Sequence, residues 1–163
     1  MKYHFYIEGT RSLPEWMNLL ARKDFVRGWS KKINPMGVYS HYGRGIGVVL
    51  ELQQVLKYNK FCRTIERLFQ LKPTGKGIFH IDESDLATGG ELRDIPSMVQ
   101  MLSVMLTIEA GAAIVLSDDH DILLRRREDL LVLNADSGFW TPSRLTHIRL
   151  PYERRPLPTP LRE

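Results

Sequence analysis

A long apolar stretch, Pro96–Leu116, constrains the fold of this chain more than any other feature. It carries one formal charge, Glu109, and is long enough to suggest a membrane span. However, Gln100 and Gly111 interrupt it, and a cluster of acidic residues follows it directly. We therefore interpret it as a buried helix followed by a buried strand. Both elements need other layers of the same domain to cover them.

The whole chain has the composition of an ordinary globular domain. It has 163 residues, of which 43% are hydrophobic and 26% are charged. Its single cysteine, Cys62, cannot form an internal disulfide and sits in an apolar pattern, so we expect a buried thiol in a reducing compartment. We expect a cytoplasmic protein with no membrane partner.

Alternating strand and helix patterns predict an α/β or α+β fold. We expect one domain over residues 1–150, with a mixed sheet of about four to six strands covered by helices. Residues 151–163 contain four prolines and are predicted to form an extended, largely unpacked tail. The predicted strands are 2–7, 78–81, 112–116, 122–124 and 130–133. Two helices are predicted to begin near residues 13 and 94, and a third is predicted to span residues 48–71. Residues 28–47 are predicted to be a loop.

Charge is distributed very unevenly along the chain. Residues 77–124 carry nine acidic side chains and one arginine, whereas residues 1–76 carry fourteen basic and five acidic side chains. Residues 125–163 are again basic, with eight arginines against five acidic side chains. A concentrated acidic segment indicates either a metal site or a surface for a basic partner.

One interpretation of the acidic segment is a metal-dependent active site. Asp119 and Asp121 follow a predicted buried strand, and Glu8 follows the first strand. Clustered carboxylates are suitable ligands for Mg²⁺ or Mn²⁺. The pair of Glu8-Gly9 and Asp119-x-Asp121 resembles Toprim nucleases, which implies magnesium-dependent cleavage by Glu8, Asp119 and Asp121. The chain lacks the acidic residue that such nucleases carry soon after Glu8, and it lacks the strand-one aspartate of PIN-type nucleases.

The alternative is a purely structural turn. Short side chains such as those of Ser117, Asp118 and Asp119 accept hydrogen bonds from nearby backbone N–H groups and hold a loop between two strands. His120 is then a surface residue or a binding contact.

In its overall features, and mainly over its second half, the chain resembles the small immunity proteins of bacterial type VI or contact-dependent toxin systems. The resemblance depends on its size, its α+β pattern, its acidic segment without a complete catalytic set, and the run from Asp94-Ile95-Pro96-Ser97 to Ser117-Asp118-Asp119-His120-Asp121. It implies a non-catalytic inhibitor, without a cofactor, that binds a cognate nuclease toxin through an acidic surface. Nucleic acid is not an expected partner.

Under this hypothesis the acidic side chains complement a basic toxin surface and speed association. Phe139 and Trp140 are candidate aromatic anchors, although a core lid over the sheet is the preferred interpretation of these two rings. The predicted partner-binding residues are Asp82, Glu83, Asp85, Asp118, Asp119, His120, Asp121, Phe139 and Trp140.

Overall fold

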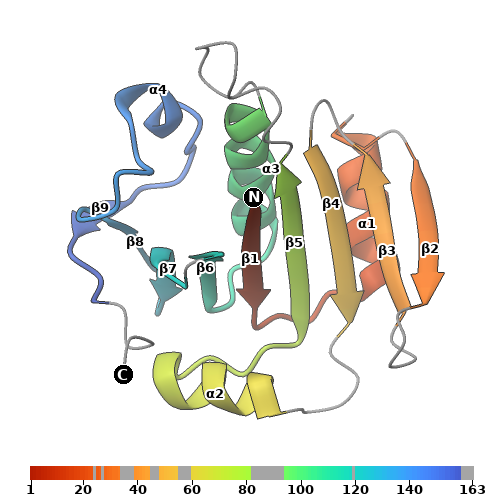
Figure 1. Cartoon of the computed structure of the whole chain (residues 1–163), viewed down its shortest axis with the longest axis horizontal. Helices are drawn as coiled ribbons and strands as arrows, with labels where there is room; N and C mark the ends of the chain where they lie inside the picture. The colour runs from red at the N-terminus through yellow and green to blue at the C-terminus, as the bar shows by residue number, and fades with distance from the viewer. Residues whose placement is uncertain are drawn as a thin grey trace.

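A single nine-stranded sheet organises the protein in the computed structural model (Figure 1). The structure describes residues 1–23, 25–26, 28–33, 39–44, 48–54, 60–81, 94–118 and 120–158. The strand order is β2-β3-β4-β5-β1-β6-β7-β8-β9, and every neighbouring pair is antiparallel except β8 and β9. The predicted α+β class and mixed sheet are confirmed, but the sheet has more strands than the predicted four to six.

The strands are β1 (Lys2–Ile7), β2 (Trp29–Ile33), β3 (Tyr39–Arg44), β4 (Val48–Gln54), β5 (Gly75–Ile81), β6 (Ala113–Ser117), β7 (Ile122–Arg127), β8 (Leu130–Asn134) and β9 (Glu153–Arg155). The described helices are α1 (Leu13–Arg22), α2 (Lys60–Phe69), α3 (Asp94–Ile108) and α4 (Pro142–Leu145).

Strand β1 lies at the centre of the sheet, between β5 and β6. Because side chains alternate between the two faces of a strand, Tyr3, Phe5 and Ile7 of β1 enter the main core while Tyr6 enters a second cluster on the opposite face. The first strand of the chain therefore contributes to the cores on both faces of the sheet.

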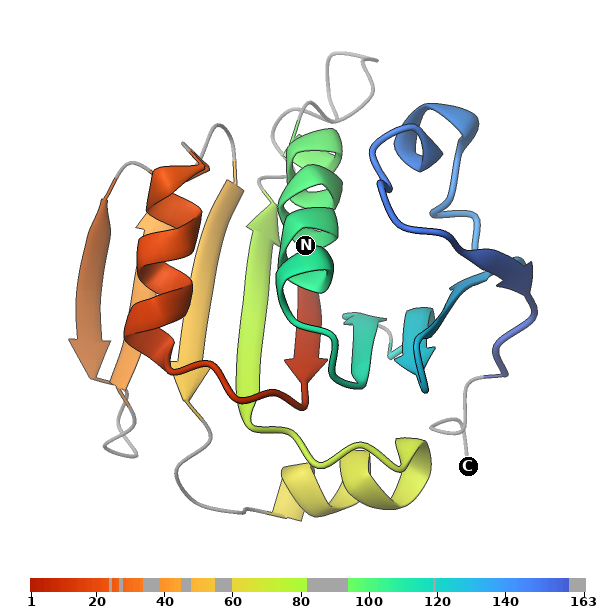
Figure 2. The ribbon, with the colours of Figure 1, turned by 180° about the vertical axis from the view of Figure 1, so that it is seen from behind.

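The helices cover the two faces unequally. Helices α1 and α3 lie on one face, in front of the sheet in Figure 2, and bury the main core. Helix α2 packs on the other face, where Ile65 and Phe69 contact the cluster formed by β1, β6, β7 and β8. Figure 1 shows no described helix in front of strands β2 to β5 on that face. Within the part of the chain that the structure describes, this half of the sheet therefore has no covering helix.

The apolar stretch folds as the sequence predicts. Helix α3 buries seven apolar side chains, the first of which is Ile95, and β6 follows it with four buried residues. Since this helix has 15 residues and lies on a sheet, its apolar surface is covered by protein. No helix that the structure describes is long and apolar enough to cross a bilayer. The buried residues of α3 include Met98, Val99, Met101, Leu102, Met105 and Leu106.

Two secondary-structure predictions were wrong. The predicted helix over 48–71 is a strand, β4, followed later by helix α2. Val48, Leu50 and Leu52 alternate into the core, which is the two-residue period of a strand. Residues 28–47, predicted to be a loop, contain strands β2 and β3. Glycines in that segment did not prevent strand pairing.

Part of the predicted C-terminal tail belongs to the sheet. Strand β9 pairs in parallel with β8, and Leu157 is buried. The buried Asn134 amide Nδ2 donates to the carbonyls of Ile122 (2.7 Å) and Leu157 (3.3 Å), and its Oδ1 accepts from the N–H of Leu157 (3.0 Å). Residues 153–157 are therefore fixed against the domain, contrary to the expectation of an unpacked tail.

Candidate functional site

The turn between β6 and β7 carries the described part of the acidic segment. Ser117 Oγ accepts from the N–H of Asp121 (3.2 Å), and the Ser117 carbonyl accepts from the N–H of His120 (2.9 Å). His120 has a φ of 63°, a left-handed conformation in which histidine is enriched among non-glycine residues. The predicted role of Ser117 as a turn cap is confirmed.

Asp118 joins this turn to the start of β1. Its Oδ2 accepts from the N–H of Lys2 (2.6 Å), and its Oδ1 lies 3.5 Å from Nε2 of His4. The Asp118 side chain is 47% exposed, so its charge still faces solvent. Burial lowers the pKa of His4, and Lys76 adds to this effect while the Asp118 contact opposes it. His4 therefore favours its neutral form, which leaves the Asp118 charge less compensated.

A second histidine–carboxylate pair lies on the open half of the sheet. His80 Nε2 is 2.9 Å from Oε2 of Glu51, and the Gln53 amide donates to Glu51 Oε1 (2.6 Å). The Glu51 side chain is buried, and His80 is directly opposite Lys2 in the β1–β5 register. This surface, which carries Glu51, His80 and His4, is termed the open face.

Lys76 lies beside the open face, where burial and a nearby carboxylate have opposite effects on its pKa. Burial lowers its pKa, while the Glu51 carboxylate raises it. Its Nζ lies 5.7 Å from the centre of the Tyr6 ring, and burial raises the pKa of that phenol. The open face is thus a polar surface whose charges are partly balanced within the chain.

The remaining predicted acidic residues, Asp82, Glu83, Asp85 and Asp119, lie outside the described residues. The strands that precede them, β5 and β6, both end beside the start of β1. The amino group of Met1 donates to the carbonyl of Ile81 (3.1 Å), and the N–H of Lys2 donates to Asp118. This end of the sheet, termed the acidic edge, carries Asp118, His120 and Asp121.

Glu8 lies at the opposite end of β1. Its Oε2 accepts from the N–H of Lys72 (2.9 Å), and its backbone N–H donates to the carbonyl of Ala112 (2.8 Å). Strand β6, which is five residues long, separates Ala112 from the turn that contains Asp121, a distance of roughly 16 Å. Ligands of one divalent ion lie within about 2.6 Å of it, so Glu8 and Asp121 do not share an ion.

No metal site is formed among the described residues. In that part of the chain, no group of three or more histidine, cysteine, aspartate or glutamate side chains is placed to hold an ion. Two residues of the predicted nuclease set, Glu8 and Asp121, are therefore not brought together. The third, Asp119, lies outside the described residues.

The candidate aromatic anchors Phe139 and Trp140 are packed in the main core, which argues against their contact with a partner. Both side chains are buried, and Trp140 Nε1 donates to the carbonyl of Leu123 (2.7 Å). The Phe139 ring packs edge-on against Tyr3 at 5.4 Å, with the Arg144 guanidinium 4.8 Å from its centre. The alternative interpretation, a lid over the sheet, is confirmed.

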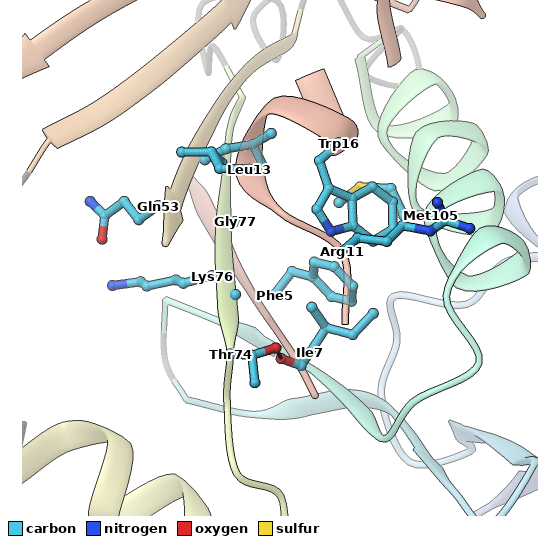
Figure 3. A pocket seen from close by; sticks show the side chains of 12 residues that line it. Phe5, Ile7, Arg11, Leu13, Trp16, Gln53, Thr74, Lys76, Gly77 and Met105 are labelled. Carbon is cyan, nitrogen blue, oxygen red and sulfur yellow. Dashed lines mark hydrogen bonds between the residues drawn. The ribbon is translucent and has the colours of Figure 1, made fainter. Parts of the chain in front are cut away.

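A small cavity lies on the helix-covered face, above Gly75 and Gly77 of β5 (Figure 3). Its volume is about 20 Å³, which is room for about one water molecule. The rings of Phe5 and Trp16 line it, and Figure 3 shows Lys76 pointing away from them. The cavity exists because two glycines face the core, and it is too small for a cofactor.

Sequence reasoning missed the pair of Glu51 and His80. Residues 48–71 were predicted to be one helix, which would place Glu51 on a different surface. The pair forms only because β4 and β5 are neighbours in the sheet, and no local pattern in the sequence indicates this contact.

Comparison with protein families places the chain beside a known family over most of its length. The model of the SitI3-like family matches residues 1–144. The matched region contains both the acidic edge and the open face. No curated protein and no solved structure is significantly similar to the chain. The family name is of the kind given to immunity proteins, which supports the predicted resemblance to a toxin–immunity family.

Proposed function

Because the chain belongs to the SitI3-like family, we propose that it is a non-catalytic immunity protein that binds and neutralises a cognate bacterial toxin. The family match over residues 1–144 is the observation that carries this proposal. Inhibition by binding needs no cofactor and no set of catalytic residues.

The proposed toxin-binding surface is the acidic edge. Asp118 presents an exposed carboxylate there, and the turn that holds it is fixed by hydrogen bonds to Ser117 and to the start of β1. A preorganised turn loses little conformational freedom when a partner binds. Carboxylates at this edge attract a basic partner surface and accelerate association at low ionic strength.

The finer proposal is that the toxin is a nuclease. A nuclease holds its substrate through a basic surface that neutralises phosphates, and acidic side chains can occupy that surface in place of nucleic acid. Such a toxin would be met in the cytoplasm after delivery by type VI secretion or by cell contact. The proposed partner of this chain is therefore the toxin itself, and neither a membrane nor nucleic acid.

The test is protection of living cells. The chain is produced in bacteria together with the toxin-like protein encoded beside it, and survival and binding of the purified pair are measured. We expect survival with the native chain. Asp118→Asn keeps an oxygen that can accept from Lys2 but removes the charge, and we expect it to weaken binding by about fivefold, mainly through slower association.

Asp136→Asn is the matched control. Asp136 is an exposed aspartate in the turn after β8, and only its backbone N–H is tied, to Asn134 Oδ1. We expect this variant to bind as the native chain does. If Asp118→Asn and Asp136→Asn bind the toxin equally well, the acidic edge is not part of the interface. Cleavage of DNA or RNA by the purified chain with Mn²⁺ would instead overturn the proposed non-catalytic function.

A further inference from the structure

A groove lies between helix α2 and the C-terminal segment, on the face of the sheet that α2 covers. Its volume is about 340 Å³, within the range of small ligand sites. Five apolar residues form its floor and walls, and they come from α2, β7, β8 and the segment after β9. These residues are Leu68, Phe69, Ile122, Val132 and Leu157.

The wall formed by the C-terminal segment is held in place. Asn134 hydrogen-bonds both the N–H and the carbonyl of Leu157, and Ala135 N–H donates to the carbonyl of Arg155 (2.9 Å). Pro156 and Pro158 also line the groove and have no N–H group to offer. The wall is therefore a fixed, mainly apolar surface opposite α2.

Two arginines give the groove a positive charge. Arg125 lies opposite Val132 in the β7–β8 register and is half-buried. Within the described part of the chain, no carboxylate pairs with Arg125. Arg155 lies 3.1 Å from Glu153, which balances part of its charge. A guanidinium next to an apolar floor favours a ligand that supplies a carboxylate, because the two can form paired hydrogen bonds.

We propose that this groove binds a short extended peptide segment of a protein partner, in which an acidic residue alternates with bulky apolar residues. The carboxylate pairs with Arg125, and the neighbouring apolar side chains cover Phe69 and Val132. This site differs in chemistry from the acidic edge, which suits a basic surface. The inference does not rest on the proposed function.

The test uses a fluorescent hexapeptide of alternating leucine and aspartate, with the full-length chain and fluorescence anisotropy as the measurement. A hexapeptide of alternating leucine and lysine is the ligand control. We expect the acidic peptide to bind and the basic one not to bind. Arg125→Gln should weaken binding of the acidic peptide by about tenfold, since it removes a charge-assisted pair.

Arg127→Gln is the matched protein control. Arg127 lies two residues further along β7, is exposed, and does not line the groove. It should bind the acidic peptide as the native chain does. Leu68→Ala tests the floor at a half-buried helix position, where truncation is not expected to unfold the protein; binding should weaken about fivefold, and thermal melting checks that the variant is folded.

Three outcomes would overturn the proposal. The first is equal loss of binding in Arg125→Gln and Arg127→Gln, which would indicate general charge attraction. The second is no binding by the native chain together with binding by a chain that ends at Pro158, which would make residues 159–163 the occupant. The third is concentration-dependent dimerisation that Arg125→Gln abolishes, which would make a second copy the occupant.

Discussion

The backbone N–H of Lys2 donates to the carboxylate of Asp118 at 2.6 Å, so the start of the central strand is tied to the turn after β6. This contact gives Asp118 a structural role in addition to its proposed role in binding. The two roles are separable, because only the second requires a negative charge.

Asp118→Ala should lower the free energy of unfolding by about 1 kcal/mol, since it removes the acceptor of one hydrogen bond to a charged group. Asp118→Asn should lower it by less, because its amide oxygen can still accept from Lys2. Urea denaturation of both variants measures the difference. Equal destabilisation would mean that the charge, and not the hydrogen bond, stabilises the start of β1.

His4 should make stability depend on pH. Burial holds its pKa in the folded protein below the ordinary value of 6.5, so the unfolded chain binds more protons in that range. The free energy of unfolding should therefore fall as pH is lowered through 6.5 and should level off below the folded-state pKa. His4→Gln should flatten this part of the profile, as measured by urea denaturation between pH 5 and 7.5. An unchanged profile would contradict the assignment to His4.

Gly77→Ala should stabilise the protein by about 0.5–1 kcal/mol, because alanine restricts the unfolded chain and fits the native backbone. A Cβ there would lie 3.5 Å from Leu52 and 3.6 Å from Phe5, which are ordinary contacts on the side of the small cavity. The measurement is the melting temperature. A decrease would show that the cavity has no room for a methyl group.

Gly111→Ala is the contrasting substitution. A Cβ at this position would lie 1.5 Å from the backbone oxygen of Glu8, so the chain between α3 and β6 would have to move away from β1. We expect a loss of about 3 kcal/mol or more. The same melting experiment compares it with Gly77→Ala, and a mild effect would show that this junction can shift.

Asn134→Ala should release the C-terminal segment. Its amide satisfies the backbone of Ile122 and Leu157, and these buried groups would lose their partners. We expect a loss of about 3 kcal/mol and faster cleavage by trypsin after Arg154, followed by mass spectrometry; the next bond, Arg155–Pro156, resists trypsin. Unchanged cleavage would mean that the pairing of β9 with β8 is sufficient to hold the segment.

The sequence predicts the fold best where local patterns and burial agree. The helix and strand between Asp94 and Ser117 were predicted because almost every residue there is apolar, and they form α3 and β6. A helix was predicted to begin near residue 13, and Ser12 caps the start of α1, where its Oγ accepts from the N–H of Glu15 (3.3 Å). These features depend on neighbouring residues in the chain, which the sequence shows directly.

Contacts between distant segments explain the failures. Val48 and Leu52 fit the spacing of a helix as well as that of a strand, and only pairing with β5 selects the strand. The sequence left Phe139 and Trp140 open between an aromatic anchor and a lid over the sheet, because their partners Tyr3 and Leu123 lie far away along the chain.

The basic run at 125–127 illustrates the same limit. It lies between the predicted strands 122–124 and 130–133, but it forms the end of β7, and strand alternation places Arg126 on the face opposite Arg125. Arg126 is buried and donates to the carbonyls of Leu106, Glu109 and Gly111 at the end of α3. A positive charge stabilises the C-terminal end of a helix, so one arginine of the three has a structural function.

The central position of β1 also affects how the protein acquires its fold during synthesis. Its backbone partners near Ile81 and Asp118 are made 80 and 116 residues later. Strand β1 therefore waits for the synthesis of β5 and β6 before its hydrogen bonds are complete. Pairing over such long separations is slow, so we expect the hydrogen bonds of β1 to form late in folding.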